Sequence, residues 1–434
     1  MEHKVLQTAG KIYFMAVAVL MYYFLTQTVN LGVFVTLRHV FALVLVGSTF
    51  LAFLIKPNVA RGAVSMRLAL IASLPFFVTI VVSLFIWFVE QVDAAVISRG
   101  LSGAFFYSNA LSFSLAAGAF LYVFGEKGIW YNLLAILISN ILSLLLIIAQ
   151  NGIGVFVSEF IRLVITFAGD TGDVIVQAEI HELAFCLGAY LIYMLMKPRK
   201  NFTFLLLLGL SGFCFLAAFK RIGIIAIALA LVLGWALLWV AKFRKSTAKN
   251  LAVIFSLAMM AVLVGYIGLI KMDVFSMLEE AGIETSGRVI VYKAVDKFYE
   301  FSPSFLGNGI GYLTYQLNTN MSVGVSAVHN DFLQYFVDLG FWGYLLWLAS
   351  TTVIRVCCFG AKGRTENAIL TFALCLYLVI ASSTDNTVNY PLLTTTLAVI
   401  MMGHGFDEQV RQREQKLFGY ISPANREQQG GALL

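Results

Sequence analysis

Long apolar stretches constrain this chain more than any other feature. A helix that spans a bilayer needs roughly 20 mostly apolar residues, and the chain contains about 12 runs that approach this length. Only 12% of its 434 residues are charged, and its mean hydropathy of +0.88 excludes a water-soluble enzyme and a disordered chain. We therefore predict an all-α, polytopic membrane protein. The runs lie at about 12–27, 39–55, 68–89, 104–124, 129–149, 174–196, 202–219, 222–241, 251–270, 340–356, 367–382 and 390–405.

The distribution of positive charge predicts the orientation of these runs. When the loops are assigned alternately to two faces, one face together with both termini holds 20 of the 29 Lys and Arg residues. Cytoplasmic loops carry an excess of Lys and Arg, so this face and both termini are predicted to be cytoplasmic. The modest net charge of +6 argues against a nucleic-acid partner. Cytoplasmic loop cations in this scheme include Lys56, Arg61, Arg67, Lys197, Arg244, Arg355 and Arg364.

Four parts follow from this layout. Residues 1–271 form a transmembrane bundle of about nine spans, and 272–331 form an acidic extracytoplasmic loop with short helices. Residues 332–406 return to the membrane as the C-terminal transmembrane helices, and 407–434 form a polar cytoplasmic tail. The amphipathic, glycine-interrupted segment 151–169 is predicted to lie in the outer interface rather than to cross.

Cations on the outer face oppose the orientation rule and therefore need a reason. Lys220 and Arg221 stand together in a very short turn between two apolar runs. One interpretation is that both side chains snorkel to lipid headgroups. The other is that the pair holds a lipid-linked phosphate, which cationic side chains bind by charge-assisted hydrogen bonds.

Arg288 is a second outer cation, at the start of a short stretch with helical spacing that ends before Pro303. Its two interpretations are a solvated charge at a helix end and a contact to phosphate. The downstream sequence G-N-G-I-G at 307–311 lacks the third glycine and the strand context of a nucleotide-binding loop, so we interpret it as a flexible turn.

His329 precedes a segment in which apolar residues recur at helical spacing, and Asn330 or Asp331 can cap the start of that helix. A histidine at a helix N-terminus is disfavoured in its charged form, so a neutral imidazole that can accept a proton is expected. A lone histidine is more often structural than catalytic, and both interpretations stay open at this point.

Other polar residues are weaker candidates for substrate contacts. Glu182 lies beside His181 near the outer half of a predicted span, where a carboxylate is costly and is either functional or bonded between helices. Arg99, Arg162 and Asp385 are outer-face residues that could line a path for a sugar. The five cysteines lie in or beside apolar runs without ligand-like spacing, so neither a disulfide framework nor a metal site is predicted.

The combination of these motifs resembles the O-antigen ligase and polymerase superfamily over residues 210–405. The most specific element is H-N-x-x-L followed by six residues and a glycine, here His329, Asn330, Leu333 and Gly340. K-R-I-G at 220–223 is similar to the family's arginine motif, which often reads S-R-G, with Lys220 in place of the serine. This departure leaves the role of Lys220 open.

The resemblance implies a metal-independent, cofactor-free glycosyltransferase of the GT-C type in a bacterial inner membrane, with its active site facing the periplasm. Its donor would be a glycan on undecaprenyl diphosphate. His329 would act as the general base on the acceptor hydroxyl, and Arg221, Arg288 and Lys220 would bind the diphosphate, with inversion at the anomeric carbon. Arg99, Arg162, Glu182 and Asn330 are further possible substrate contacts.

Two branches of the superfamily and one other class remain as alternatives. A polymerase of O-antigen or capsular repeat units, which is favoured, uses a second lipid-linked glycan as acceptor and would work with a chain-length regulator. A ligase transfers the finished glycan to lipid A-core. A transporter of lipid-linked oligosaccharide would show internal repeats and interrupted helices around a midplane site, and no repeat is visible in the sequence.

Overall fold

The computed structural model describes residues 2–23, 37–90, 94–166, 181–218, 220–282, 288–319, 328–361, 364–385, 387 and 390–418. Among these residues every regular element is helical, which confirms the all-α prediction. The first half of the chain forms α1 (Glu2–Tyr23), α2 (Leu37–Ile55), α3 (Val59–Ala72), α4 (Leu74–Glu90), α5 (Ala94–Phe124), α6 (Gly128–Asn151), α7 (Ile153–Thr166), α9 (His181–Met196) and α10 (Phe202–Ala217). The second half forms α11 (Arg221–Phe243), α12 (Lys245–Lys271), α13 (Val274–Glu280), α14 (Arg288–Val295), α15 (Tyr312–Thr319), α16 (Asp331–Thr351), α17 (Val353–Phe359), α18 (Thr365–Ser382), α19 (Pro391–Gly403) and α20 (Phe406–Phe418).

Among the described residues, six helical segments are long and apolar enough to cross a membrane, or seven if the bent pair α3–α4 is one span. The segment Leu111–Asn151 has 41 residues, which at 1.5 Å per residue is about twice the thickness of a hydrocarbon core. It is interrupted at Gly125, whose φ of 64° begins a short 3-10 turn between α5 and α6. Four shorter apolar helices fall within other predicted runs: Thr8–Tyr23, Glu182–Met196, Phe202–Ala217 and Pro391–Gly403.

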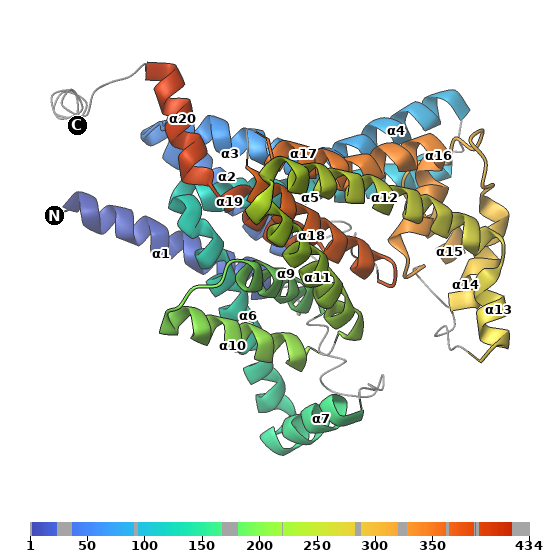
Figure 1. Cartoon of the computed structure of the whole chain (residues 1–434), viewed down its shortest axis with the longest axis horizontal. Helices are drawn as coiled ribbons and strands as arrows, with labels where there is room; N and C mark the ends of the chain where they lie inside the picture. Colours follow the sequence, from blue (N-terminus) through green and yellow to red (C-terminus); the bar gives the residue numbers. More distant parts are fainter. Residues whose placement is uncertain are drawn as a thin grey trace.

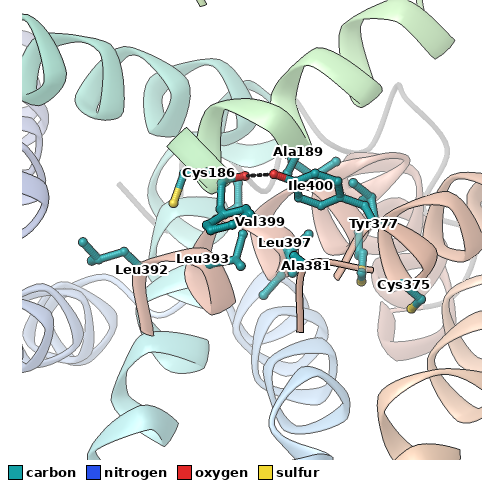
Figure 2. Close-up of a cluster of buried hydrophobic side chains, with 14 of the residues drawn as sticks. Cys186, Ala189, Cys375, Tyr377, Ala381, Leu392, Leu393, Leu397, Val399 and Ile400 are labelled. Atoms are coloured by element: carbon teal, nitrogen blue, oxygen red, sulfur yellow. Dashed lines mark hydrogen bonds between the residues drawn. The ribbon is translucent and has the colours of Figure 1, made fainter. Parts of the chain in front are cut away.

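The centre of the bundle is formed by α18 and α19, most of whose residues are buried. Figure 2 shows side chains of these two helices packed together with Cys186 and Ala189 of α9. The Tyr377 hydroxyl donates a hydrogen bond to the Phe185 carbonyl at 2.9 Å. This approach requires Gly188, since a Cβ atom there would lie 2.2 Å from the Tyr377 hydroxyl oxygen. The core therefore packs α18 and α19 closely against α9.

The helix that follows His329 is broken at Gly340. Gly340 has φ 69° and ψ −177°, which lies outside the helical region. The ring of Tyr335, before the break, stacks on the ring of Trp347, after it, with ring centroids 4.0 Å apart. In a straight helix, residues 12 positions apart would lie about 18 Å apart along the axis. The two halves of α16 therefore fold back on each other.

The loop 305–311 fills this break. Phe341 N donates to the Phe305 carbonyl at 2.9 Å, and a Cβ atom on Gly340 would lie 2.1 Å from the carbonyl carbon of Leu306. The Asp338 carboxylate accepts hydrogen bonds from Gly311 N and Leu313 N at 3.0 and 2.9 Å. Asn308 N and Gly309 N donate to the Asp338 carbonyl at 3.1 and 2.7 Å. The prediction of a flexible turn at 307–311 is therefore wrong, because its backbone donors are held by hydrogen bonds to Asp338 and, at residue 310, to Ser83.

A second break separates α3 from α4, which are bent by 54° at Ser73. Arg355 of α17 donates to the Ala72 carbonyl at the end of α3 at 2.6 Å, and it is only 6% exposed. Its assignment as a cytoplasmic loop cation is therefore wrong. The positive charge meets the partial negative charge of a helix C-terminus inside the protein.

Figure 1 places α20 and the first turns of α1 toward one end of the molecule, and α13, α14 and α15 toward the other. α20 packs on α3, where the Arg67 guanidinium donates to the Gln409 side chain at 2.8 Å. α7 stands away from the main bundle, and its 14 residues are too short to cross a bilayer upright. Apolar side chains of α7 are exposed at Ile153, Val155, Val157, Ile161 and Ile165.

A polar cluster at the loop between α18 and α19

The loop after α18 receives side chains from three distant parts of the chain. Its described residues are 383–385, 387 and 390. Lys220 reaches it from the start of α11, Arg288 from the start of α14, and Asp331 from the start of α16. Each of these residues stands at or just before the first turn of its helix, so three helix starts meet at one loop. We call this group of residues the loop cluster.

Lys220 and Asp385 form the most direct contact in the loop cluster. The Lys220 ammonium donates to one Asp385 carboxylate oxygen at 2.9 Å, and the Tyr390 hydroxyl donates to the other at 2.8 Å. The side chains of Lys220 and Asp385 are 20% and 11% exposed. Lys220 also lies 5.9 Å from the centroid of the Phe185 ring, a cation–π distance. Its charge is therefore compensated within the protein while part of it stays accessible.

Arg288 begins α14, as the spacing of apolar residues predicted, and it contacts the neighbouring loop residue. Its guanidinium donates to the Thr384 carbonyl at 3.1 Å, and the side chain is half-buried. A guanidinium group has five N–H donors, so one contact to a carbonyl leaves other donors of Arg288 available. Thr384 and Asp385 are adjacent, which brings the cationic groups of Lys220 and Arg288 to the same turn of backbone.

The start of α16 joins the loop cluster through Asp331. The Thr387 hydroxyl donates to the Asp331 carboxylate at 2.6 Å and lies 2.5 Å from the Ser382 hydroxyl. Asp331 and Arg355 both line a cavity of about 60 Å³. Sequence reasoning treated Asp331 only as a helix cap and missed both contacts, because they depend on how α16 packs against α18.

His329 lies immediately before this helix and is exposed. Its backbone is in the left-handed region, with φ 51°, which non-glycine residues rarely adopt. Asn330 is fully buried and caps α16, since its side-chain oxygen accepts from Leu333 N at 3.2 Å. The prediction of a capped helix start after His329 is confirmed, and the imidazole lies on the accessible side of the cap.

Arg221 is the first residue of α11 and is exposed. Within the part of the chain that the structure describes, its side chain forms neither a hydrogen bond nor an ion pair. The N-terminus of a helix carries a partial positive charge and unpaired N–H groups, which favour a bound anion. The positive charge of the Arg221 guanidinium therefore lies beside the partial positive charge of the α11 N-terminus, and both would attract an anion.

The remaining candidates lie outside the loop cluster. Glu182 is 2% exposed and pairs with Arg38 at 3.2 Å. Its carboxylate also accepts a hydrogen bond from Leu392 N in the first turn of α19, so both contacts are structural ones within the protein. Arg162 is half-buried on α7. The side chains of Arg99 and His181, and all of Glu179, lie outside the described residues. Among the residues that are described, no three His, Cys, Asp or Glu side chains gather as a metal site would require.

A comparison with known protein families matches the segment that holds the cationic candidates and His329. Residues 183–348 match the family described as O-Antigen ligase. The match includes Lys220, Arg221, Arg288, His329 and the Gly340 break, and it ends before the loop at 383–390. No curated protein matches the chain. The chain is therefore a helical membrane protein whose residues 183–348 are similar to the O-Antigen ligase family.

Proposed function

We propose that the protein is an integral-membrane glycosyltransferase that transfers glycan from undecaprenyl diphosphate to an acceptor sugar hydroxyl. It acts on the periplasmic face of a bacterial inner membrane, as a polymerase of O-antigen or capsular repeat units. The proposal includes a GT-C-type architecture of about 12 spans with both termini in the cytoplasm. One observation carries it: Lys220, Arg288 and the helix that starts after His329 converge on the loop between α18 and α19.

The cations of this region fit a diphosphate leaving group. Arg288 has donors left over from its contact to Thr384, and Arg221 is exposed at a helix N-terminus. A guanidinium can hold two phosphate oxygens at once and stabilise the charge that grows on the leaving group. Lys220, which is paired with Asp385, adds positive charge nearby and fixes the start of α11 to the loop. We assign phosphate contact to Arg221 and Arg288, and a supporting electrostatic role to Lys220.

His329 supplies the base in this scheme. The imidazole takes the proton of the acceptor hydroxyl while that oxygen attacks the anomeric carbon. The bond between the anomeric carbon and the diphosphate oxygen breaks, and its electron pair leaves with the diphosphate. Attack from the side opposite the leaving group inverts the anomeric configuration. The step needs neither a metal nor a cofactor, because arginine side chains provide the positive charge and histidine moves the proton.

The arrangement in space supports an outer location of the site. Figure 1 shows α13, α14 and α15, which carry the acidic segment and Arg288, at the end of the molecule away from α20 and the first turns of α1. The termini belong to the face with most of the Lys and Arg residues. A cytoplasmic location of the termini therefore places Arg288 and His329 on the periplasmic side.

A transporter is the alternative from another class, and one observation favours it: α3–α4 and α16 are both interrupted. Interrupted helices in transporters surround a substrate site near the midplane. Here the break in α16 is filled by the loop 305–311, whose backbone packs against Gly340. The break thus has a structural cause that does not need a transported substrate.

The test is transfer by the purified protein in lipid nanodiscs with undecaprenyl-diphosphate repeat units as donor. A ladder of products without lipid A-core is expected of the polymerase. Product that forms only when lipid A-core is present would make the protein a ligase. Movement of the donor across a vesicle membrane with no new glycosidic bond would replace the enzyme with the transporter.

A further inference from the structure

We propose that Tyr266 and Tyr292 are positioning residues for His329, and that they act through the side chain of Asn330. This inference rests on the proposed function, because it concerns the group that takes the acceptor proton. Tyr266 lies on α12, Tyr292 on α14, and Asn330 at the start of α16. The three residues therefore join helices that the sequence separates by up to 64 positions.

Every hydrogen-bonding group of the Asn330 side chain is used. Its amide nitrogen donates to the hydroxyl oxygens of Tyr266 and Tyr292, both at 3.0 Å, and its oxygen accepts from Leu333 N. An amide has two N–H donors, and both find an acceptor here. The cap also fixes which way the amide points, since the opposite orientation would set its NH₂ group against the Leu333 N–H. Asn330 is therefore held in one orientation by three helices.

This anchoring matters because the preceding residue is strained. A left-handed conformation costs a non-glycine residue roughly 1–2 kcal/mol, and His329 adopts one. Such a conformation persists only where neighbouring contacts over-determine it. Asn330 is covalently next to His329 and makes three fixed contacts, so the tyrosine pair is what keeps the imidazole turned outward from the buried cap.

The same contacts tie the base to the phosphate-binding helix. Arg288 and Tyr292 are four residues apart on α14 and so lie on one face of it. A second set of contacts links the end of α12 to the chain after α14. The Lys271 ammonium donates to the carbonyls of Asp296 and Tyr299 at 2.9 and 3.0 Å. The distance between base and donor site is thereby set by packing rather than by a free loop.

The experiment replaces each hydroxyl and keeps each ring. Tyr266→Phe and Tyr292→Phe each remove one acceptor of Asn330, and Tyr344→Phe is the matched control. Tyr344 is a buried tyrosine of α16 whose hydroxyl donates to the Leu263 carbonyl at 3.3 Å, whereas the two N–H groups of Asn330 donate to Tyr266 and Tyr292. Full-length variants in nanodiscs are compared for kcat, for KM of the undecaprenyl-diphosphate donor, and for the pH dependence of kcat.

We expect kcat to fall about three- to tenfold in each of the two variants, the range that one hydrogen bond supports. KM should change less, because the phosphate contacts remain, and the acidic limb of the pH profile should move. The control should keep both constants within about twofold of the wild type. A loss of kcat in the control equal to that in the two variants would make the effect structural and overturn the proposal.

A second measurement does not depend on activity. With ¹⁵N-labelled histidine, the His329 signal is assigned by its absence in His329→Ala and followed in the tyrosine variants. We expect it to shift in Tyr266→Phe and Tyr292→Phe and to stay in place in Tyr344→Phe. An unmoved signal in the double variant Tyr266→Phe/Tyr292→Phe, together with wild-type kcat, would overturn the inference alone. Full activity of His329→Ala would instead overturn the proposed function.

Discussion

The Lys220 ammonium lies 2.9 Å from a carboxylate oxygen of Asp385, a residue 165 positions away in the chain. This contact links the start of α11 to the loop that also receives Arg288 and Asp331. The ion pair is mostly shielded, so removing either partner would leave the other charge largely buried and uncompensated. The contact gives a structural reason for the cation at Lys220, which the predicted orientation places on the outer face.

The ion pair can be tested by a double-mutant cycle with Lys220→Met and Asp385→Asn. Each single variant leaves one charge uncompensated, so each should lower the melting temperature and the rate of transfer. In the double variant the losses should not add, with a coupling free energy of about 1–2 kcal/mol. Thermal unfolding in detergent and the donor kcat/KM measure the cycle. Fully additive losses would show that the two residues act independently.

Arg221 should contribute directly to use of the donor. Arg221→Ala is expected to lower kcat/KM for the lipid diphosphate about 10- to 100-fold, because an accessible charged donor to phosphate is lost. Arg221→Lys should recover only part of the rate, since an ammonium cannot form a two-pronged contact. Arg244→Ala is the matched control, as Arg244 is an exposed arginine next to a helix start on the predicted cytoplasmic side. Wild-type kcat/KM in the lysine variant would favour simple snorkelling.

The break at Gly340 should not tolerate a side chain. Gly340→Ala would place a Cβ atom 2.1 Å from the Leu306 carbonyl carbon on a backbone with φ 69°. We expect a loss of about 3 kcal/mol or more in stability, seen as a lower melting temperature and poor yield in the membrane. Gly209→Ala in α10 is the control, because its Cβ would meet nothing within 4 Å. That variant should be as stable as the wild type or slightly more so. Equal melting temperatures for both variants would contradict the packing described for the break.

The proposed orientation can be measured without any substrate. A reporter fused after Gly282 should be active in the periplasm, and one fused after Arg244 should be active in the cytoplasm. Both positions lie between helices, so neither fusion interrupts a span. A cytoplasmic result at Gly282 would place Arg288 and His329 on the wrong face for a donor that is presented outside.

The all-helical character could be predicted from the sequence, because apolar runs and their polar boundaries are local properties. The number of spans could not, since breaks such as that at Ser73 inside the predicted run 68–89 depend on how helices pack. A cap at Asn330 or Asp331 could be predicted for the same reason as the helices, since a cap residue followed by helical spacing is a local pattern, and the structure shows that the cap is Asn330. Arg355 was misassigned because its charge suggested a loop, whereas the end of α3, which it caps, lies far away in the chain.

The loop cluster could be predicted only as a set of separate residues. Lys220 and Arg288 were each singled out as outer-face groups, but nothing local indicates that Asp385 and Thr384 accept their hydrogen bonds, or that Thr387 donates to Asp331. The roles of Tyr266 and Tyr292 were missed for the same reason. A tyrosine near the end of an apolar run is common at membrane interfaces, and its partner becomes visible only when α12, α14 and α16 are packed together.

Single-turnover transfer by His329→Ala tests the central claim most directly. The variant is saturated with undecaprenyl-diphosphate donor and acceptor, and formation of the new glycosidic bond is followed beside the wild type and Tyr344→Phe. Removal of a general base predicts a fall in rate of at least about 100-fold, with donor binding and melting temperature unchanged. Bond formation at the wild-type rate in His329→Ala would contradict the account, because no proton acceptor would then be required at the start of α16.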